Sequence, residues 1–217
     1  DRQQVKNNDL GMALMMRGDN DRALEVFAED LQHAKAIGDD LLVARAHYNL
    51  AQGHMRGGKL EAGIAEYLAC VDVCKDAKNT ELMLRAYNGL GNACQTKNDL
   101  ENSLKYYERG AALYERVGDL RGGNAISINI GIVLNLSGKA DEALAKLVPS
   151  VEFLKNLSFK SSSDLFAIAR GLLELGSIKR CRTDFEDAAR YLNEALGITS
   201  SEAGAKPLRF WVLSEMA

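Results

Sequence analysis

Apolar residues recur along this chain at helical spacing, in stretches of similar length that end at short polar breaks. Over residues 40–56, Leu42, Ala46 and Leu50 mark one face of a predicted α-helix. A second amphipathic stretch, 60–74, follows a pair of glycines, and so short a loop makes the two predicted helices antiparallel. The next predicted helices are 81–96 and 100–116.

The predicted helix pairs repeat at a spacing of 40 residues. Leu10-Gly11 returns at this spacing, and a turn dipeptide, Gly18-Asp19, keeps the same phase. The later copies are Leu50-Ala51, Leu90-Gly91, Ile130-Gly131 and Leu175-Gly176 for the first marker, and Gly58-Lys59, Asn98-Asp99, Gly138-Lys139 and Thr183-Asp184 for the second, with five extra residues before the last copy of each. A period of this size predicts a stacked array of like units.

We expect one domain over residues 1–217, because neither helix of a pair can cover its apolar stripe without the neighbouring pair. The predicted units are approximately 1–39, 40–79, 80–119, 120–159 and 160–202, with a partial sixth unit at 203–217 whose first helix would include 207–213. The chain starts inside a repeat without Met, so a fragment of a longer protein is expected. The extra residues fall in the serine-rich stretch 158–163, where we expect a flexible polar linker, with a phosphorylation site as the alternative.

Composition narrows the class of protein. Hydrophobic residues make up 47% of the chain and charged residues 26%, as expected of a soluble chain that buries one face of each helix. A net charge of -3 gives no reason to expect nucleic acid as a partner. No apolar run is long enough to predict a membrane span. The four cysteines lack paired CxxC spacing and favour a reducing compartment, so we expect a cytoplasmic protein, with association to the cytoskeleton as an option.

Within each unit, two spacings resemble the tetratricopeptide repeat. A small residue in the first helix has a small partner twelve positions on, as in Gly91 and Ser103, and a large residue follows four positions later, here Tyr107. The other small pairs are Gly11 with Ala23, Ala51 with Gly63, Gly131 with Ala143 and Gly176 with Ala188, and the other large residues are Phe27, Tyr67, Leu147 and Leu192. The resemblance covers nearly the whole chain. It implies an all-α fold, a right-handed α-α superhelix (TPR solenoid) of antiparallel helix pairs.

The second helix of each unit is longer than in the commonest form of the repeat, whose period is about 34 residues. It ends in segments such as Ala36-Ile37-Gly38-Asp39 and Arg116-Val117-Gly118-Asp119. This long version is similar to the repeats of kinesin light chains and of the Pins/LGN adaptors. The resemblance implies an array whose first helices line a concave groove that holds an extended peptide from a partner protein.

First-helix residues that are not needed for packing would form the floor of that groove. Arginine beside amide side chains suits a carboxylate and the backbone of an extended peptide, so Arg45, Arg85 and Arg170 are the expected anchors for acidic side chains. The candidate peptide-binding residues are Arg45, Tyr48, Gln52, Met55, Arg85, Asn88, Asn92, Gln95, Ile128, Ile132, Asn135 and Arg170. Methionines of the first unit and isoleucines of the fourth would place hydrophobic anchors toward the ends of the ligand.

Structural roles are the alternatives for several of these residues. Arg45 and Arg85 could pair with carboxylates of neighbouring helices, such as Asp39 or Glu81, in solvated ion pairs. The two isoleucines could be covered by neighbouring side chains. The methionines of the first unit, Met12, Met15 and Met16, could fill a core.

No catalytic, metal or cofactor site is expected. His47 and His54 lie on one helix face, but at positions where the repeat buries a large side chain, and an HExxH motif is absent. Cys70 takes a position for a small residue one turn before Cys74, which favours inert burial over a redox pair. The sequence therefore predicts a protein without enzymatic activity.

Taken together, these patterns predict a non-enzymatic adaptor or scaffold that binds an extended, acidic-plus-hydrophobic partner peptide in the concave groove. One alternative is a structural subunit of a cytoskeletal or ciliary assembly, docked by its convex face or its ends. Another is a regulatory array that controls an attached domain outside this sequence. The expected partner is a protein or peptide, and the pattern specifies neither its identity nor the oligomeric state.

Overall fold

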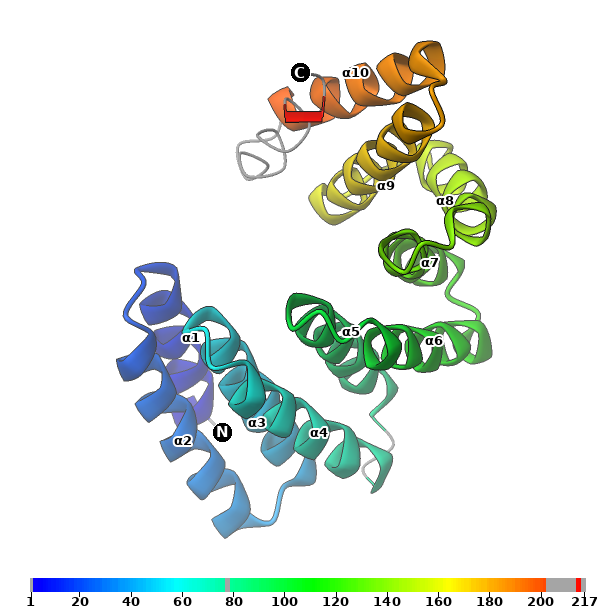
Figure 1. Ribbon diagram of the computed structural model, residues 1–217. Coiled ribbons are helices and arrows are strands. Elements are labelled where there is room, and N and C mark those ends of the chain that lie inside the picture. Colours follow the sequence, from blue (N-terminus) through cyan, green and yellow to red (C-terminus); the bar gives the residue numbers. More distant parts are fainter. Residues whose placement is uncertain (1, 77–78, 202–213, 216–217) are drawn as a thin grey trace. The chain divides into compact units, whose positions relative to one another are not determined.

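The computed structural model describes residues 2–76, 79–201 and 214–215, and these residues form helices joined by short turns (Figure 1). The helices are α1 (Arg2–Met16), α2 (Asn20–Ile37), α3 (Asp40–Arg56), α4 (Leu60–Asp76), α5 (Thr80–Thr96), α6 (Leu100–Val117), α7 (Leu120–Leu136), α8 (Ala140–Lys155), α9 (Ser162–Cys181) and α10 (Phe185–Ser201). The predicted all-α fold of paired helices is confirmed. The predicted helix at 207–213 lies outside the described residues. No helix in the described ranges is long and apolar enough to cross a membrane.

Contacts between Cα atoms divide the chain into two compact units, Asp1–Leu113 and Tyr114–Ala217. In unit 1, each helix from α1 to α4 packs on the next, and α3 also contacts α5. In unit 2, α7 packs on α8 and on α9, and α9 packs on α10. The first helices of successive pairs are therefore neighbours within each unit. A single array over residues 1–217 stays a prediction.

The turn inside each helix pair explains the second sequence marker. The second residue after the end of the first helix has a left-handed backbone, with φ between 72° and 82° at Gly18, Gly58 and Gly138. The same position is Asn98 in the third pair, with φ 59°, and Thr183 in the fifth, with φ 60°. Glycine takes this conformation without steric cost, whereas a β-branched threonine is strained there. The repeat thus preserves the turn geometry, which different residues adopt at different cost.

Small residues in the first helices leave room for large side chains of the second helices. A Cβ atom at Gly91 would lie 2.4 Å from Cε1 of Tyr107, whose side chain is wholly buried. Ser103 Oγ donates a hydrogen bond of 2.8 Å to the carbonyl oxygen of Gly91 at the same crossing. The equivalent close approaches are Gly11 to Phe27, Gly131 to Leu147 and Gly176 to Leu192. These contacts set the small distance between the two helices of a pair.

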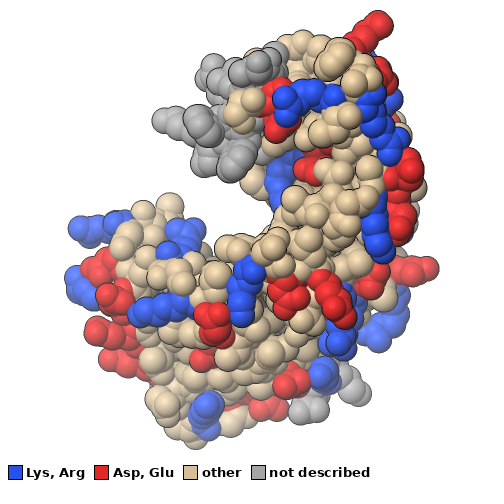
Figure 2. Space-filling view, viewed as in Figure 1, with Lys and Arg blue, Asp and Glu red and all other residues tan. Residues whose placement is uncertain are grey.

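Acidic residues at one repeated position link consecutive pairs. Asp21, Glu61 and Asp141 each lie in the first turn of a second helix. Their partners lie in the turn inside the next helix pair: Lys59 for Asp21 at 3.6 Å, Lys97 for Glu61 at 3.0 Å and Arg182 for Asp141 at 2.7 Å. Figure 2 shows acidic and basic side chains interleaved over the visible surface. Because water screens both partners of each pair, these contacts contribute little to stability.

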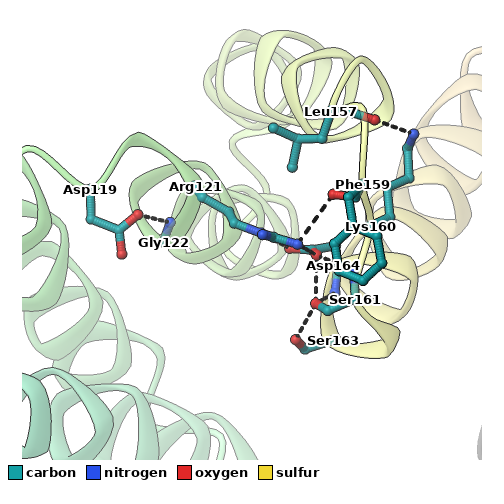
Figure 3. A network of polar contacts seen from close by, with 9 residues as sticks. All are labelled: Asp119, Arg121, Gly122, Leu157, Phe159, Lys160, Ser161, Ser163 and Asp164. Carbon is teal, nitrogen blue, oxygen red and sulfur yellow. Dashed lines mark hydrogen bonds and ion pairs between the residues drawn. The ribbon is translucent and has the colours of Figure 1, made fainter.

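The extra residues before α9 form an ordered connection, not the flexible linker expected from the sequence. Ser161 and Asp164 make a capping box, in which the Ser161 backbone N–H donates to Asp164 Oδ2 at 2.6 Å. Arg121 of α7 donates from Nε to Asp164 Oδ1 at 2.9 Å and from Nη2 to Asp164 Oδ2 (Figure 3). The same Nη2 atom donates to the carbonyl oxygen of Phe159 at 3.4 Å. One guanidinium thus ties α7 to the start of α9.

Acid sensitivity of unit 2 is expected to depend on Asp164. The hydrogen-bonded Arg121 guanidinium holds the pKa of this carboxyl well below its usual range, against the raising effect of burial. A lowered folded pKa stabilises the fold above the unfolded pKa of about 3.9, and the stabilisation is lost as the pH falls through the folded value. Melting followed by circular dichroism between about pH 5 and pH 2 should show a steeper fall for the wild type than for Asp164→Asn. Parallel curves would contradict this assignment.

Candidate functional site

Polar side chains of successive first helices meet on one face of each unit, which we call the first-helix face. In unit 1 its residues are Asn8, Arg45, Tyr48, Asn49, Gln52, Arg85, Asn88 and Asn92, and in unit 2 they are Asn129, Asn135, Arg170 and Glu174. Counting the extra residues before α9, Arg45, Arg85 and Arg170 occupy one repeated position. The predicted peptide-binding residues that lie at these first-helix positions are Arg45, Tyr48, Gln52, Arg85, Asn88, Asn92, Asn135 and Arg170, and their role in binding stays a prediction.

Arg45 and Arg85 are both exposed. Neither makes a hydrogen bond or an ion pair within the part of the chain that the structure describes, so the alternative of pairing with Asp39 or Glu81 is not observed. The Arg85 guanidinium lies 5.5 Å from the centre of the Tyr48 ring, in a cation–π arrangement between α5 and α3. Gln52 Nε2 donates to the Tyr48 hydroxyl at 2.7 Å. These contacts hold Arg85 in place without using its N–H donors.

The remaining candidates of unit 1 are half-buried. Asn92 Oδ1 accepts a hydrogen bond of 2.7 Å from the Tyr107 hydroxyl, and Gln95 Oε1 lies 3.4 Å from the same hydroxyl. Asn88 lies one turn before Asn92 on α5. Met55 packs inward, because its Sδ atom would lie 2.8 Å from a Cβ atom at Gly63. Asn92 and Gln95 therefore support the core as well as the surface, and Met55 serves packing between α3 and α4.

The predicted apolar floor in unit 2 needs correction. Ile128 is 0% exposed and Ile132 is 6% exposed, so both belong to the core and cannot line an open surface. The alternative of cover by neighbouring side chains is the one observed. Methionines of the first unit divide between the two roles, since Met15 is 2% exposed whereas Met12 and Met16 are 37% and 81% exposed.

Unit 2 instead presents paired polar groups. Asn135 Nδ2 donates to Glu174 Oε1 at 2.6 Å. Arg170 Nη1 donates to Asn129 Oδ1 at 2.9 Å, and its guanidinium lies 5.9 Å from the Phe166 ring centre. Burial raises the pKa of Glu174, and the Asn135 hydrogen bond and the charge of Arg170 oppose that rise. The carboxylate of Glu174 was not anticipated from the sequence, although it stands at the repeated position of Asn49 and Asn129.

The other residue missed from the sequence is Asp30 on α2. Its side chain is buried, with 6% exposure, although it carries a carboxyl group. The same position in the other pairs is Cys70, Gly110, Ser150 and Ala195. An acidic residue at a repeated position that otherwise holds small residues was visible in the sequence and could have pointed to Asp30. Carboxylates are rarely buried without a partner, so a buried acid deserves separate consideration.

The residues considered for other chemistry have packing contacts. His47 Nδ1 lies 2.6 Å from Glu66 Oε2, between α3 and α4. The Sγ atoms of Cys70 and Cys74 are 4.0 Å apart, and both thiols are buried. The hydrogen bond with Cys74, together with burial, raises the pKa of Cys70. The described residues contain no cluster of three or more metal-binding side chains.

Comparisons with known proteins identify the repeat. The family model of the tetratricopeptide repeat matches residues 42–116. BtubC (BKLC) from P. vanneervenii is 17% identical, with a TM-score of 0.79 over 91% of this chain and 80% of that one. Nearly identical TPR-like repeats of a Podosopora anserina protein described as a kinesin light chain are 14% identical, with a TM-score of 0.71 over 92% and 96%. A Rap protein complexed with competence and sporulation factor is 9% identical, with a TM-score of 0.71 over 89% of this chain and 53% of that one.

The family match identifies residues 42–116 as tetratricopeptide repeats, and the structural likeness shows the fold of such repeats over about nine-tenths of this chain. A search of curated protein sequences gives no match. The predicted likeness to kinesin light chains is confirmed for the fold, and at such low identity it extends no further. Members of this class are typically non-enzymatic modules for protein interaction.

Proposed function

We propose that the protein is a non-enzymatic adaptor that holds an extended segment of a partner protein on the first-helix face of unit 1, with Arg85 as the anchor for an acidic side chain. The observation that carries this proposal is that Arg85 is exposed and has unused hydrogen-bond donors. Its guanidinium is exposed and held over the Tyr48 ring, and no described residue accepts a hydrogen bond from it. An arginine positioned by stacking with its donor fork unused suits a bidentate carboxylate.

Amide groups beside Arg85 are suited to a peptide backbone. Gln52 uses its Nε2 donor on Tyr48 and makes no described hydrogen bond through its Oε1 acceptor. Asn92 uses its Oδ1 acceptor on Tyr107, which leaves its Nδ2 donor. A ligand strand offers both N–H and C=O groups at regular intervals, so one acceptor and one donor near the anchor can fix its direction.

Hydrophobic anchors of the ligand are proposed to lie toward α1. Leu10, Met12 and Met16 are 50%, 37% and 81% exposed, and flexible methionine side chains adapt to varied apolar partners. A segment with an acidic residue near Arg85 and apolar residues toward α1 would complement this surface. Rap protein, one of the structures with the same fold, is known in a complex with competence and sporulation factor, which supports binding by this fold. Four free thiols support a reducing compartment such as the cytoplasm.

The proposal is tested with peptides selected on the wild-type protein from a displayed library of short random peptides. We expect the selected peptides to share an acidic residue, and Arg85→Ala to weaken their binding about tenfold or more, as measured by fluorescence anisotropy, because a charge-assisted hydrogen bond is lost.

The matched control is Arg109→Ala. Arg109 also lies over a tyrosine ring, 5.9 Å from the centre of Tyr106, but on the second helix α6 of the same unit. Its replacement should leave affinity within about twofold. Equal losses in both variants would contradict the proposed surface, and binding that depends only on second-helix residues would favour a scaffold docked by its other face.

A further inference from the structure

A small polar pocket opens between α1, α2 and α3 in unit 1. Its lining residues are Asn8, Asp30, Leu42, Arg45, Ala46 and Asn49. It has room for about one water-sized group, with a volume of about 10 Å³. The wall is fixed by a hydrogen bond of 2.8 Å from Asn49 Nδ2 to Asn8 Oδ1. The pocket is therefore a depression next to Arg45 whose wall contains a hydrogen-bonded pair of amides.

The pocket contains a buried carboxyl group at a repeated position that small residues fill in the other helix pairs. Asp30 stands where the other helix pairs have cysteine, glycine, serine or alanine, each of them buried. Burying a carboxyl is costly unless hydrogen bonds compensate it. Within the described part of the chain, Asp30 accepts one hydrogen bond, from Asn7 Nδ2 to Oδ1 at 2.9 Å. A carboxylate has about four acceptor sites, so Asp30 retains unused capacity.

Arg45 faces the same pocket without closing it. Burial raises the pKa of Asp30, and the Asn7 hydrogen bond and the charge of Arg45 oppose that rise. Arg45 is thus close enough to act on Asp30 through its charge. The two side chains nevertheless make no ion pair in the described structure, and Arg45 is exposed. A donor fork and a buried acceptor therefore line the same small pocket.

We infer that this pocket receives the N–H₂ end of a carboxamide, the side-chain amide of an asparagine or glutamine in the bound segment, because that group is about the size of the one water molecule that the pocket can hold. The amide oxygen would accept from Arg45, and the amide N–H₂ would donate to Asp30. A carboxylate in the same place would be repelled by Asp30, and an ammonium group would be repelled by Arg45. A neutral group with both a donor and an acceptor can form hydrogen bonds with Asp30 and with Arg45 at the same time. This inference rests on the proposed function and assigns the two arginines different ligands, an acid for Arg85 and an amide for Arg45.

The test uses the same displayed peptide library on three proteins: the wild type, Asp30→Ser and Arg85→Ala. Serine is chosen because Ser150 occupies the equivalent buried position, so the fold should tolerate it. Urea unfolding followed by circular dichroism checks that the variants remain folded. We expect wild-type peptides to share one asparagine or glutamine at a fixed distance from the acidic residue. Asp30→Ser should lose the amide preference and keep the acidic one, and Arg85→Ala should do the reverse.

A second measurement gives the size of the effect. Changing the shared glutamine of a selected peptide to glutamate should weaken binding to the wild type about tenfold or more, and binding to Asp30→Ser by much less, because the repelling carboxylate is gone. Peptides with the acidic residue but no shared amide would overturn this inference and leave the proposed function standing. A library without binders to the wild type would overturn both.

Discussion

Replacing Gly91 with valine is expected to destabilise the protein by about 3 kcal/mol, the largest effect among our predictions, because the new side chain would overpack the core. Even a Cβ atom at this position would lie 2.4 Å from the Tyr107 ring, and that ring is 0% exposed and has no space to move into. Alanine is a milder change, since Ala51 holds the equivalent position beside Tyr67. Valine adds two methyl groups at the crossing of α5 and α6. Urea unfolding followed by circular dichroism measures the loss.

The matched control is Gly197→Ala on α10. No heavy atom lies within 4 Å of a Cβ atom built at Gly197, and its backbone is helical. Alanine is favoured over glycine inside a helix by about 1 kcal/mol, so this variant should be as stable as the wild type or more stable. If Gly91→Val had the same urea midpoint of unfolding as the wild type, the close approach of α5 and α6 at Gly91 would be contradicted.

Replacing Arg121 with alanine is expected to lower the melting temperature of unit 2 by about 5 °C. The change leaves the Asp164 carboxylate, 5% exposed, without its guanidinium partner. It also removes the contact that joins α7 to the carbonyl of Phe159 and so to the turn before α9. A buried carboxylate that loses its cation costs far more than an exposed one, because little water replaces the lost bonds. Thermal unfolding followed by circular dichroism measures the shift.

Arg182→Ala is the control for this effect. Arg182 also pairs with an aspartate of unit 2, at 2.7 Å, and the two arginine side chains are equally accessible, with 42% exposure for Arg121 and 41% for Arg182. The partners differ, since the side chain of Asp164 is 6% exposed and that of Asp141 is 91% exposed. We expect almost no shift for Arg182→Ala. Similar shifts in both variants would show that burial of the aspartate does not set the contribution of the pair.

Parts of the candidate site were accessible from the sequence and parts were not. Arg45 and Arg85 were found because the repeat fixes which side of a first helix faces its partner, and a charged residue on the other side stays exposed. Ile128 and Ile132 were misplaced by the same reasoning, because the rule gives the direction of a side chain and not what covers it. Asp30 was overlooked because second helices were treated as packing alone, although its departure from the small residues of its repeated position was visible in the sequence.

The sequence alone determined the helices, their pairing and their period. Helix ends, left-handed turn residues and the small-to-large packing positions are local features that recur in every unit, so each copy confirms the others. Only the tertiary structure decided the partners of the polar side chains. Examples are Arg85 over Tyr48, Arg170 with Asn129, and Arg121 with Asp164 across the extra residues. These residues are about 40 positions apart and come into contact through helix packing. Their exposure and their electrostatic surroundings depend on every neighbouring helix, and the periodicity of the sequence carries no information about those contacts.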